Sequence, residues 1–356
     1  MIALLQLATH ERVHRIIFTS IGNHISHLAN LLVMKTTEHV NYLDGWRGLA
    51  IALVLESHFV GLLPVAAGRL GVDVFFCLSG FLMSGLLFIQ RQSLVTFYKR
   101  RVSRIMPAFF AFVITVYLFA ICYAIPVTTT EFISTVLFLR TYFPAYPGMW
   151  GSGIPIGHIW SLNVEEHCYV FMSLLILLRL FRGREGFVLL AVGTLSVCLG
   201  IVYVKLGTTA PRWGDLGTEV AASHLLVAAG YRLIRERWHF RVSPSTPLLA
   251  LALGMACYAN GMPWWSSILF SPYLLAFSIN HLTETFGGFK ALLAAPAFRY
   301  LGIWSFSIYL WQQPFYTYKT SYPGGTSAAF ATAFVISLAS YYILELPCRT
   351  WLNKHW

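Results

Sequence analysis

Long apolar runs, separated by short charged or Gly- and Pro-rich breaks, follow one another from about residue 43 to the end of the chain. A helix that crosses a bilayer needs about 20 mostly apolar residues, and most of these runs approach that length. The pattern predicts an all-α, polytopic membrane protein with about ten transmembrane helices, at residues 46–64, 71–90, 105–125, 159–181, 187–205, 215–235, 245–259, 264–282, 298–317 and 326–344. Between the third and fourth helices, residues 133–143 are expected to form a short interfacial or re-entrant piece.

Residues 1–42 have a different pattern, with five histidines and apolar runs too short to cross a membrane. These histidines have neither a regular helical spacing nor nearby Cys or carboxylate partners. An interfacial or weakly ordered extension is therefore favoured over a metal-binding tract. No small-residue cleavage site follows an apolar core, so we expect no cleaved signal peptide. The chain is expected to divide into this extension and a transmembrane domain at residues 43–356.

Composition supports the membrane interpretation. Of the 356 residues, 57% are hydrophobic and only 11% are charged, and the mean hydropathy is +0.65, values that a water-soluble domain could not keep dissolved. The net charge of +11 comes from short clusters between apolar runs rather than from one basic face, which argues against nucleic-acid binding. The six cysteines occur singly and form no ligand spacing, so neither a disulfide framework nor a metal site is expected.

Lysines and arginines concentrate in alternate connections between the predicted helices. The richest connections are 91–104, 179–184 and 232–241, whereas the connections between them carry few cations. Cytoplasmic loops are enriched in Lys and Arg, so both termini are expected in the cytoplasm.

Arg47 and His58 lie inside the first predicted transmembrane helix. Ionisable groups at such positions are costly and favour a functional interpretation. Eleven residues of α-helix turn through about 1100°, so the two side chains are expected on one face, roughly 16 Å apart along the axis. That separation suits a long, thin substrate arm such as pantetheine.

Four helices are predicted to bring polar side chains to one depth of the membrane. At a rise of about 1.5 Å per residue, His58, Ser79 and Glu165 lie roughly 18 Å from the cytoplasmic face and Gln312 roughly 21 Å. A single Ser could bond its own helix and a Gln could join two helices, but an acid and an imidazole in apolar surroundings need partners. We expect Glu165 to orient His58 as a general base.

The rival carboxylates for that role are Glu56 and Glu166, and Glu56 points away from His58 on a regular helix. Near the cytoplasmic face, Arg101 and Arg104 are spaced i and i+3 just before Pro107. Two guanidiniums in that arrangement can bind phosphates. A phosphorylated donor is expected to dock there and at Arg47, with its reactive end at the His58 layer.

These residues fall in six segments that together resemble the motifs of the acyltransferase-3 family of membrane O-acyltransferases. The segments carry, in order, an Arg-x10-His spacing, an FFxxSG motif, an RxxR motif, a pair of glutamates, a YLWQQP run and an ELP run. They lie at Leu43–His58, Gly71–Leu87, Phe97–Pro107, Ile159–Val170, Ser307–Pro314 and Tyr341–Arg349. Their order and spacing cover nearly all of the chain after residue 42.

The resemblance implies a ten-helix enzyme of the bacterial cytoplasmic membrane that transfers an acyl group, commonly acetyl, from cytoplasmic acyl-CoA. The usual acceptors are hydroxyls of surface carbohydrates such as O-antigen, exopolysaccharide or peptidoglycan. Acyl-CoA is a co-substrate, and no tightly bound cofactor is implied. By motif, His58 corresponds to the catalytic histidine, Arg47 to its companion and Glu165 to the more constant glutamate. The RxxR arginines are Arg101 and Arg104, and the FFxxSG residues Phe75, Phe76, Ser79 and Gly80 are expected at the donor site.

The chain departs from the family pattern in two ways. The family commonly has His where this chain has Gln312, so a second histidine at that position cannot be required here. The optional esterase-like domain has no counterpart, which suggests a stand-alone transferase. Two other functions stay open: acylation of a small molecule such as a macrolide, and a glycan transporter or flippase that performs no chemistry. The sequence leaves open the acyl chain, the acceptor, the oligomeric state and whether His58 carries a covalent acyl group.

Overall fold

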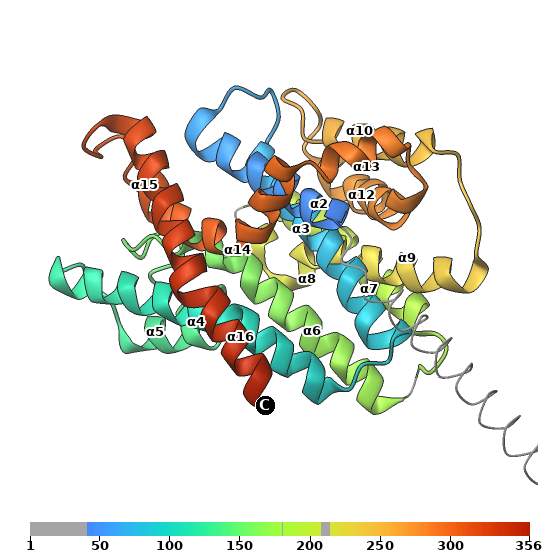
Figure 1. Ribbon diagram of the computed structural model, residues 1–356, viewed down its shortest axis with the longest axis horizontal. Helices are drawn as coiled ribbons and strands as arrows, with labels where there is room; N and C mark the ends of the chain where they lie inside the picture. Colours follow the sequence, from blue (N-terminus) through green and yellow to red (C-terminus); the bar gives the residue numbers. More distant parts are fainter. Residues whose placement is uncertain (1–40, 180, 208–213) are drawn as a thin grey trace, which may run out of the picture. The chain divides into compact units, whose positions relative to one another are not determined.

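The computed structural model describes residues 41–179, 181–207 and 214–356, and this part of the chain contains helices but no β-strand. The helices expected for an all-α protein are present (Figure 1). The α-helices are α2 (Asn41–Leu55), α3 (Ala67–Ser84), α4 (Leu94–Cys122), α5 (Thr129–Val136), α6 (Trp160–Leu178), α7 (Glu185–Leu206), α8 (Thr218–Ala221), α9 (Ser223–Trp238), α10 (Ser245–Ala256), α11 (Trp265–Leu269), α12 (Ser271–Asn280), α13 (Gly287–Leu293), α14 (Pro296–Thr317), α15 (Gly325–Ala339) and α16 (Leu346–His355).

Short π and 3-10 turns extend or link several of these helices. They include the π-helical turns η1 (Glu56–Val60), η2 (Gly85–Ile89) and η7 (Ser340–Glu345) and the 3-10 turn η3 (Gly157–Ile159). Asn41 and Tyr42, which the sequence analysis placed in the N-terminal extension, begin α2. The rest of that extension, residues 1–40, lies outside the described residues.

Each of the ten apolar runs contains helix, but fewer than ten helices have the length and apolarity of a membrane span. Among the described residues five do, or six if the bent pair α13 and α14 is one span. The other runs are interrupted or too polar. The helix expected at 264–282 is divided into α11 and α12 at Phe270, α10 has only 12 residues, and α2 carries Asp44 and Arg47. Hydropathy alone does not detect these breaks.

Glycines let several helices approach closely around the N-terminal half of α2. A Cβ atom added at Gly48 would lie 2.0 Å from the backbone oxygen of Phe298 at the start of α14, and one at Gly302 would lie 1.8 Å from that of Asp44. Such small-residue contacts are a common way to pack helices in membranes, where apolar burial gives little driving force. They hold α2 against α14. The turn η1, which continues α2, carries His58, and α14 carries Gln312.

The last turn of the helix that carries His58 is not a regular α-turn. Residues 56–60 form the π-helical turn η1, closed by a Gly61 N–H to Glu56 carbonyl bond of 2.7 Å, and Gly61 ends the helix at a φ of 69°. A π turn has more residues than an α-turn and so shifts the direction of the side chains that it contains. The regular helix used to place Arg47 and His58 on one face therefore does not apply at His58.

The connection between α4 and α6 contains the short helix α5 rather than a piece spanning 133–143. Thr128 and Glu131 form a reciprocal capping box that fixes its beginning. Glu131 is fully buried and accepts from the Arg140 Nη2 atom at 3.0 Å. This buried ion pair ties α5 to the loop that leads to Trp150 and α6.

Candidate active site

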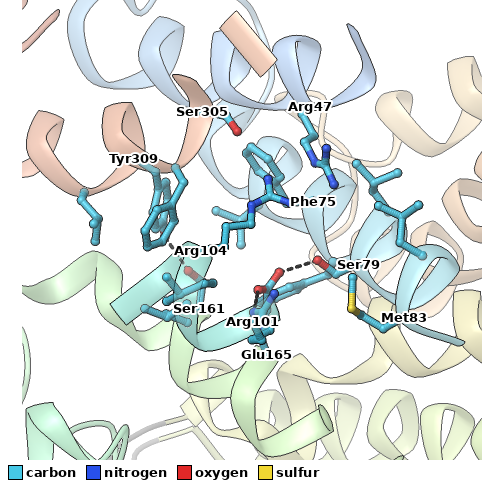
Figure 2. A pocket seen from close by; sticks show the side chains of 18 of the residues that line it. Arg47, Phe75, Ser79, Met83, Arg101, Arg104, Ser161, Glu165, Ser305 and Tyr309 are labelled. Carbon is cyan, nitrogen blue, oxygen red and sulfur yellow. Dashed lines mark hydrogen bonds and ion pairs between the residues drawn. The ribbon is translucent and has the colours of Figure 1, made fainter. Parts of the chain in front are cut away.

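A pocket lies among α2, α3, α4, α6 and α14 and includes about 860 Å³ of empty space, its open mouth counted. Its polar lining residues come from segments far apart in the sequence, and Figure 2 shows them facing a common space. They are Arg47, Ser79, Arg101, Arg104, Ser161, Glu165, Ser305 and Tyr309. The remaining walls are apolar, which is typical of a site that binds an organic ligand with a few polar anchors.

Arg101 holds two carboxylates at the floor of this pocket. Its Nη2 atom donates to Glu165 at 2.7 Å and its Nε atom donates to Glu166 at 2.9 Å, while its guanidinium lies over the Tyr169 ring at 4.0 Å. The Ser79 hydroxyl donates to the other Glu165 oxygen at 2.5 Å. Both oxygens of Glu165 are therefore occupied, and the charge of Arg101 is compensated within the protein.

Arg47 from α2 and Arg104 from α4 also point into the pocket (Figure 2). Arg47 bonds Asp44 one turn earlier at 3.1 Å. Among the described residues, no carboxylate lies within salt-bridge distance of Arg104. The RxxR arginines thus differ: Arg101 is engaged by the protein, whereas Arg104 is available to an anionic ligand.

His58 makes its side-chain hydrogen bond with Gln312 rather than with a carboxylate. Its Nδ1 atom lies 2.7 Å from Gln312 Oε1. The Gln312 amide nitrogen donates to the Tyr309 carbonyl at 3.4 Å and to Gln313 Oε1 at 3.3 Å, which assigns the amide orientation. An amide oxygen only accepts, so Nδ1 carries the proton and Nε2 is the basic nitrogen.

Further contacts hold the His58 ring on the side of α14. The imidazole stacks on Tyr316 with ring centroids 4.0 Å apart and an angle of 12°. The Lys319 ammonium donates to the His58 carbonyl oxygen. Among the described residues Nε2 has no hydrogen-bond partner, and a Cβ added at Gly68 would lie 3.9 Å from it. The ring is fixed on one side and its basic nitrogen is free on the other.

The four polar residues that were predicted to lie at one depth of the membrane form two separate hydrogen-bonded pairs. Ser79 bonds Glu165 and His58 bonds Gln312, and no hydrogen bond joins His58 to Glu165. The expected orientation of His58 by Glu165 is therefore absent. Depth counting located each residue along its helix but could not predict which pair would meet. The rival Glu56 accepts from the Leu62 and Leu63 backbone at 2.7 Å each, so it caps the end of its own helix.

The FFxxSG residues lie in different environments. Phe75, Phe76 and Ser79 line the pocket, and Phe76 also packs edge-on against Trp160 with centroids 5.8 Å apart. Gly80 is buried against α9, where an added Cβ would lie 2.0 Å from the Leu225 carbonyl oxygen. Gly80 thus permits close helix packing and does not face the donor pocket.

Sequence reasoning did not single out several residues of this region. Tyr309 lines the pocket and donates to the His158 carbonyl at 2.8 Å, and its hydroxyl lies 2.6 Å from the Ser161 hydroxyl. His158 is 4% exposed, and its ring nitrogens make no hydrogen bond of regular geometry, although the Leu310 backbone lies close by. His158 lies just before the apolar run predicted at 159–181, so the signal that marked His58, an ionisable group inside an apolar run, did not mark His158.

Known proteins similar to this chain are O-acetyltransferases by name. Peptidoglycan O-acetyltransferase OatA of Listeria monocytogenes is 25% identical over 88% of this chain and 56% of its own length. O-acetyltransferase OatA of Staphylococcus aureus is 24% identical over 89% of this chain and 58% of its own length. The chain therefore spans little more than half the length of these relatives. No solved structure matches it.

The profile of the acyltransferase domain matches residues 40–346, which include every pocket residue named above. All six segments that resemble the family motifs begin within this range. With five or six helices able to cross a bilayer among its described residues, this multi-pass membrane protein belongs to the acyltransferase-3 family.

Proposed function

We propose that this protein is a membrane O-acyltransferase that moves an acyl group, acetyl in the first instance, from acyl-CoA to a hydroxyl of a cell-surface carbohydrate. The observation that carries the proposal is His58, a half-buried imidazole whose Nδ1 proton is held by Gln312 and whose Nε2 atom has no hydrogen-bond partner among the described residues. This arrangement suits a general base for a hydroxyl. The peptidoglycan O-acetyltransferase named above supports the class of acceptor.

In this proposal the pocket binds the donor. Among the described residues Arg104 has no carboxylate within salt-bridge distance, although Glu345 lies near enough to attract it, and Arg47 bonds Asp44 through one nitrogen at 3.1 Å. Both guanidinium groups therefore keep donors that can bind the phosphates of CoA. The apolar walls, including Phe75 and Phe76, accommodate the pantetheine arm and the acyl group. Arg101 instead fixes Glu165 and Glu166, and Glu165 acts by shaping the pocket rather than by contacting His58.

The transfer then proceeds at His58. Nε2 removes the proton of the acceptor hydroxyl as its oxygen attacks the thioester carbonyl, an ester C–O bond forms, and the C–S bond to CoA breaks. The proton on His58 passes to the CoA thiolate, which leaves as the thiol. Gln312 stabilises one tautomer throughout but, being neutral, does not stabilise the imidazolium as a carboxylate would.

We further propose that ten segments cross the bacterial cytoplasmic membrane, with short helices such as α11 and α12 combining into one crossing. Both termini then lie in the cytoplasm, as the concentration of Lys and Arg in alternate connections favours. Arg47 and Arg104 lie toward the cytoplasmic side, where CoA is found, and the connections after η1, α4 and α14 lie outside.

The test is transfer of radiolabelled acetyl from acetyl-CoA to a glycan acceptor by the purified full-length protein in liposomes. We expect His58→Ala to lower turnover by about 10²- to 10⁴-fold, while the exposed His355→Ala leaves it unchanged. Wild-type turnover in folded His58→Ala would refute the mechanism. Movement of glycan across the membrane without consumption of acetyl-CoA would instead identify a transporter.

A further inference from the structure

A second groove is lined by residues that contact His58, and it shares no lining residue with the donor pocket. It is formed by the loop before η3 and by the end of α14 with the turn that follows it, and it includes about 1060 Å³ of empty space with its mouth counted. Its lining includes Trp150, Gly153, Gln313, Tyr316, Tyr318 and Lys319. In the topology proposed above, both segments are extracytoplasmic connections.

The walls of this groove also hold His58. Tyr316 stacks on the imidazole with centroids 4.0 Å apart, and Lys319 donates to the His58 carbonyl oxygen. Lys319 Nζ lies 4.7 Å from the centre of the Tyr316 ring, so the three residues form one contiguous unit. A molecule in the groove therefore lies next to the residues that contact the proposed base.

The groove and the donor pocket follow each other along the same helix. Tyr309 and Leu310 line the pocket, Gln313 and Tyr316 line the groove, and Gln312, the partner of His58, lies between them. The seven steps from Tyr309 to Tyr316 correspond to about 10 Å of α-helix. The same order recurs in η3, where Gly157 lines the groove and Ile159 lines the pocket.

The chemistry of the groove is that of a sugar-binding site. Trp150 is 62% exposed, yet its ring is seated on Gly157, where an added Cβ would lie 2.2 Å from Trp150 Cζ3. An aromatic face held open to water can pack against the C–H face of a sugar ring, while an amide and an ammonium group bind its hydroxyls. No carboxylate lines the groove, and its single cation contrasts with the three arginines of the donor pocket.

We propose that this groove binds a sugar unit of the acceptor and presents its hydroxyl to His58 from the side opposite acyl-CoA. This inference rests on the proposed function, and it identifies the groove as the route by which the acceptor reaches His58. Trp150 is the platform for the sugar ring, and Gln313 and Lys319 are the polar anchors.

The experiment uses the purified full-length protein in detergent, so that both faces are accessible, with chitotetraose as the acceptor probe and acetyl-CoA as the donor. We expect Trp150→Ala to raise KM for chitotetraose about tenfold and to leave KM for acetyl-CoA unchanged. Trp150→Phe restores part of the affinity because it keeps an aromatic face. The control is Trp264→Ala, since Trp264 is also an exposed tryptophan, at 48%, but does not line the groove.

Two further results separate this inference from the proposed function. Binding of chitotetraose measured calorimetrically without acetyl-CoA, and weakened by Trp150→Ala, supports the groove even if no acetyl is transferred. Transfer that proceeds with the same acceptor KM in Trp150→Ala and in wild type overturns the groove while the proposed function stands. An equal effect of Trp264→Ala also overturns it, because both tryptophans would then be only interfacial anchors.

Discussion

The donor pocket and a second polar cluster, centred on Asp73, contain similar residue types, but the first is open to a ligand and the second is buried. In the second cluster Ser271 Oγ lies 2.9 Å from His224 Nε2, and His224 Nδ1 lies 3.5 Å from Asp73 Oδ1. These are the residue types of a serine hydrolase triad. However, Asp73, His224 and Ser271 are 1%, 3% and 0% exposed, and none lines the donor pocket or the acceptor groove.

The Asp73 cluster instead joins three helices and the turn after α10. Asp73 in α3 accepts from Arg69 Nε at 3.0 Å and from the Tyr258 hydroxyl, after α10, at 2.6 Å, while Ser271 begins α12 and His224 belongs to α9. The comparison teaches that residue types alone do not identify a site. His58 is a candidate base because its Nε2 has no hydrogen-bond partner among the described residues, whereas both ring nitrogens of His224 face other side chains.

The largest effect is expected for Asp73→Ala, which tests whether the Asp73 cluster stabilises the fold. Loss of the buried carboxylate leaves Tyr258 and one side of Arg69 without their partner, so the free energy of unfolding should fall by about 2–4 kcal/mol. Turnover per folded molecule should not change. Unfolding in detergent, followed by tryptophan fluorescence together with the transfer rate, checks both.

The matched control for that change is Asp215→Ala, because Asp215 bonds the same Arg69 but has a 55% exposed side chain. It should alter stability little. Lost turnover with normal stability in Asp73→Ala would mean that the cluster takes part in catalysis.

The substitution Arg104→Gln tests the donor pocket. Removing one charge-assisted contact to a phosphate, worth about 1.5–3 kcal/mol, should raise KM for acyl-CoA by about 10- to 100-fold and leave the unfolding temperature unchanged. The exposed Arg100→Gln is the control, since Arg100 does not line the pocket. An unchanged KM in Arg104→Gln would remove Arg104 from the donor site.

The substitution Gly80→Ala tests whether the glycine of the FFxxSG motif is needed for ligand binding or for helix packing. An added methyl meets the Leu225 backbone, so we expect a loss of about 1–3 kcal/mol in stability with an unaltered KM for acyl-CoA. At Gly85 nothing lies within 4 Å of an added Cβ, and Gly85→Ala should be tolerated. A raised KM in a normally stable Gly80→Ala protein contradicts the packing role.

The smallest effect is expected for Ser271→Ala, the position of a triad nucleophile. Loss of its hydroxyl should cost about 1 kcal/mol of stability and leave the transfer rate as in wild type. If acyl transfer disappears in the folded variant, the Asp73 cluster is a second active centre and not a purely structural one.

Much of the site could be predicted from local spacing. Ionisable residues in apolar runs indicated Arg47, His58 and Glu165, and the i and i+3 pair indicated Arg101 and Arg104. Four of these five residues line one pocket. His58 does not, because the π-helical turn η1 redirects it toward Tyr316 and Gln312. The partner of each residue depends on helix packing, which spacing along one helix does not record.

The sequence by itself determined that this chain is helical, multi-pass and a member of its family, because apolar run length and motif order are properties of the linear chain. It did not reveal that α11 and α12 are separate helices, that Arg101 is neutralised by two glutamates, or that Gln312 orients His58. Tertiary structure decided these points, since they depend on which side chains meet across helices. Close helix packing at glycines such as Gly48, Gly80 and Gly302 helps to determine which side chains come into contact.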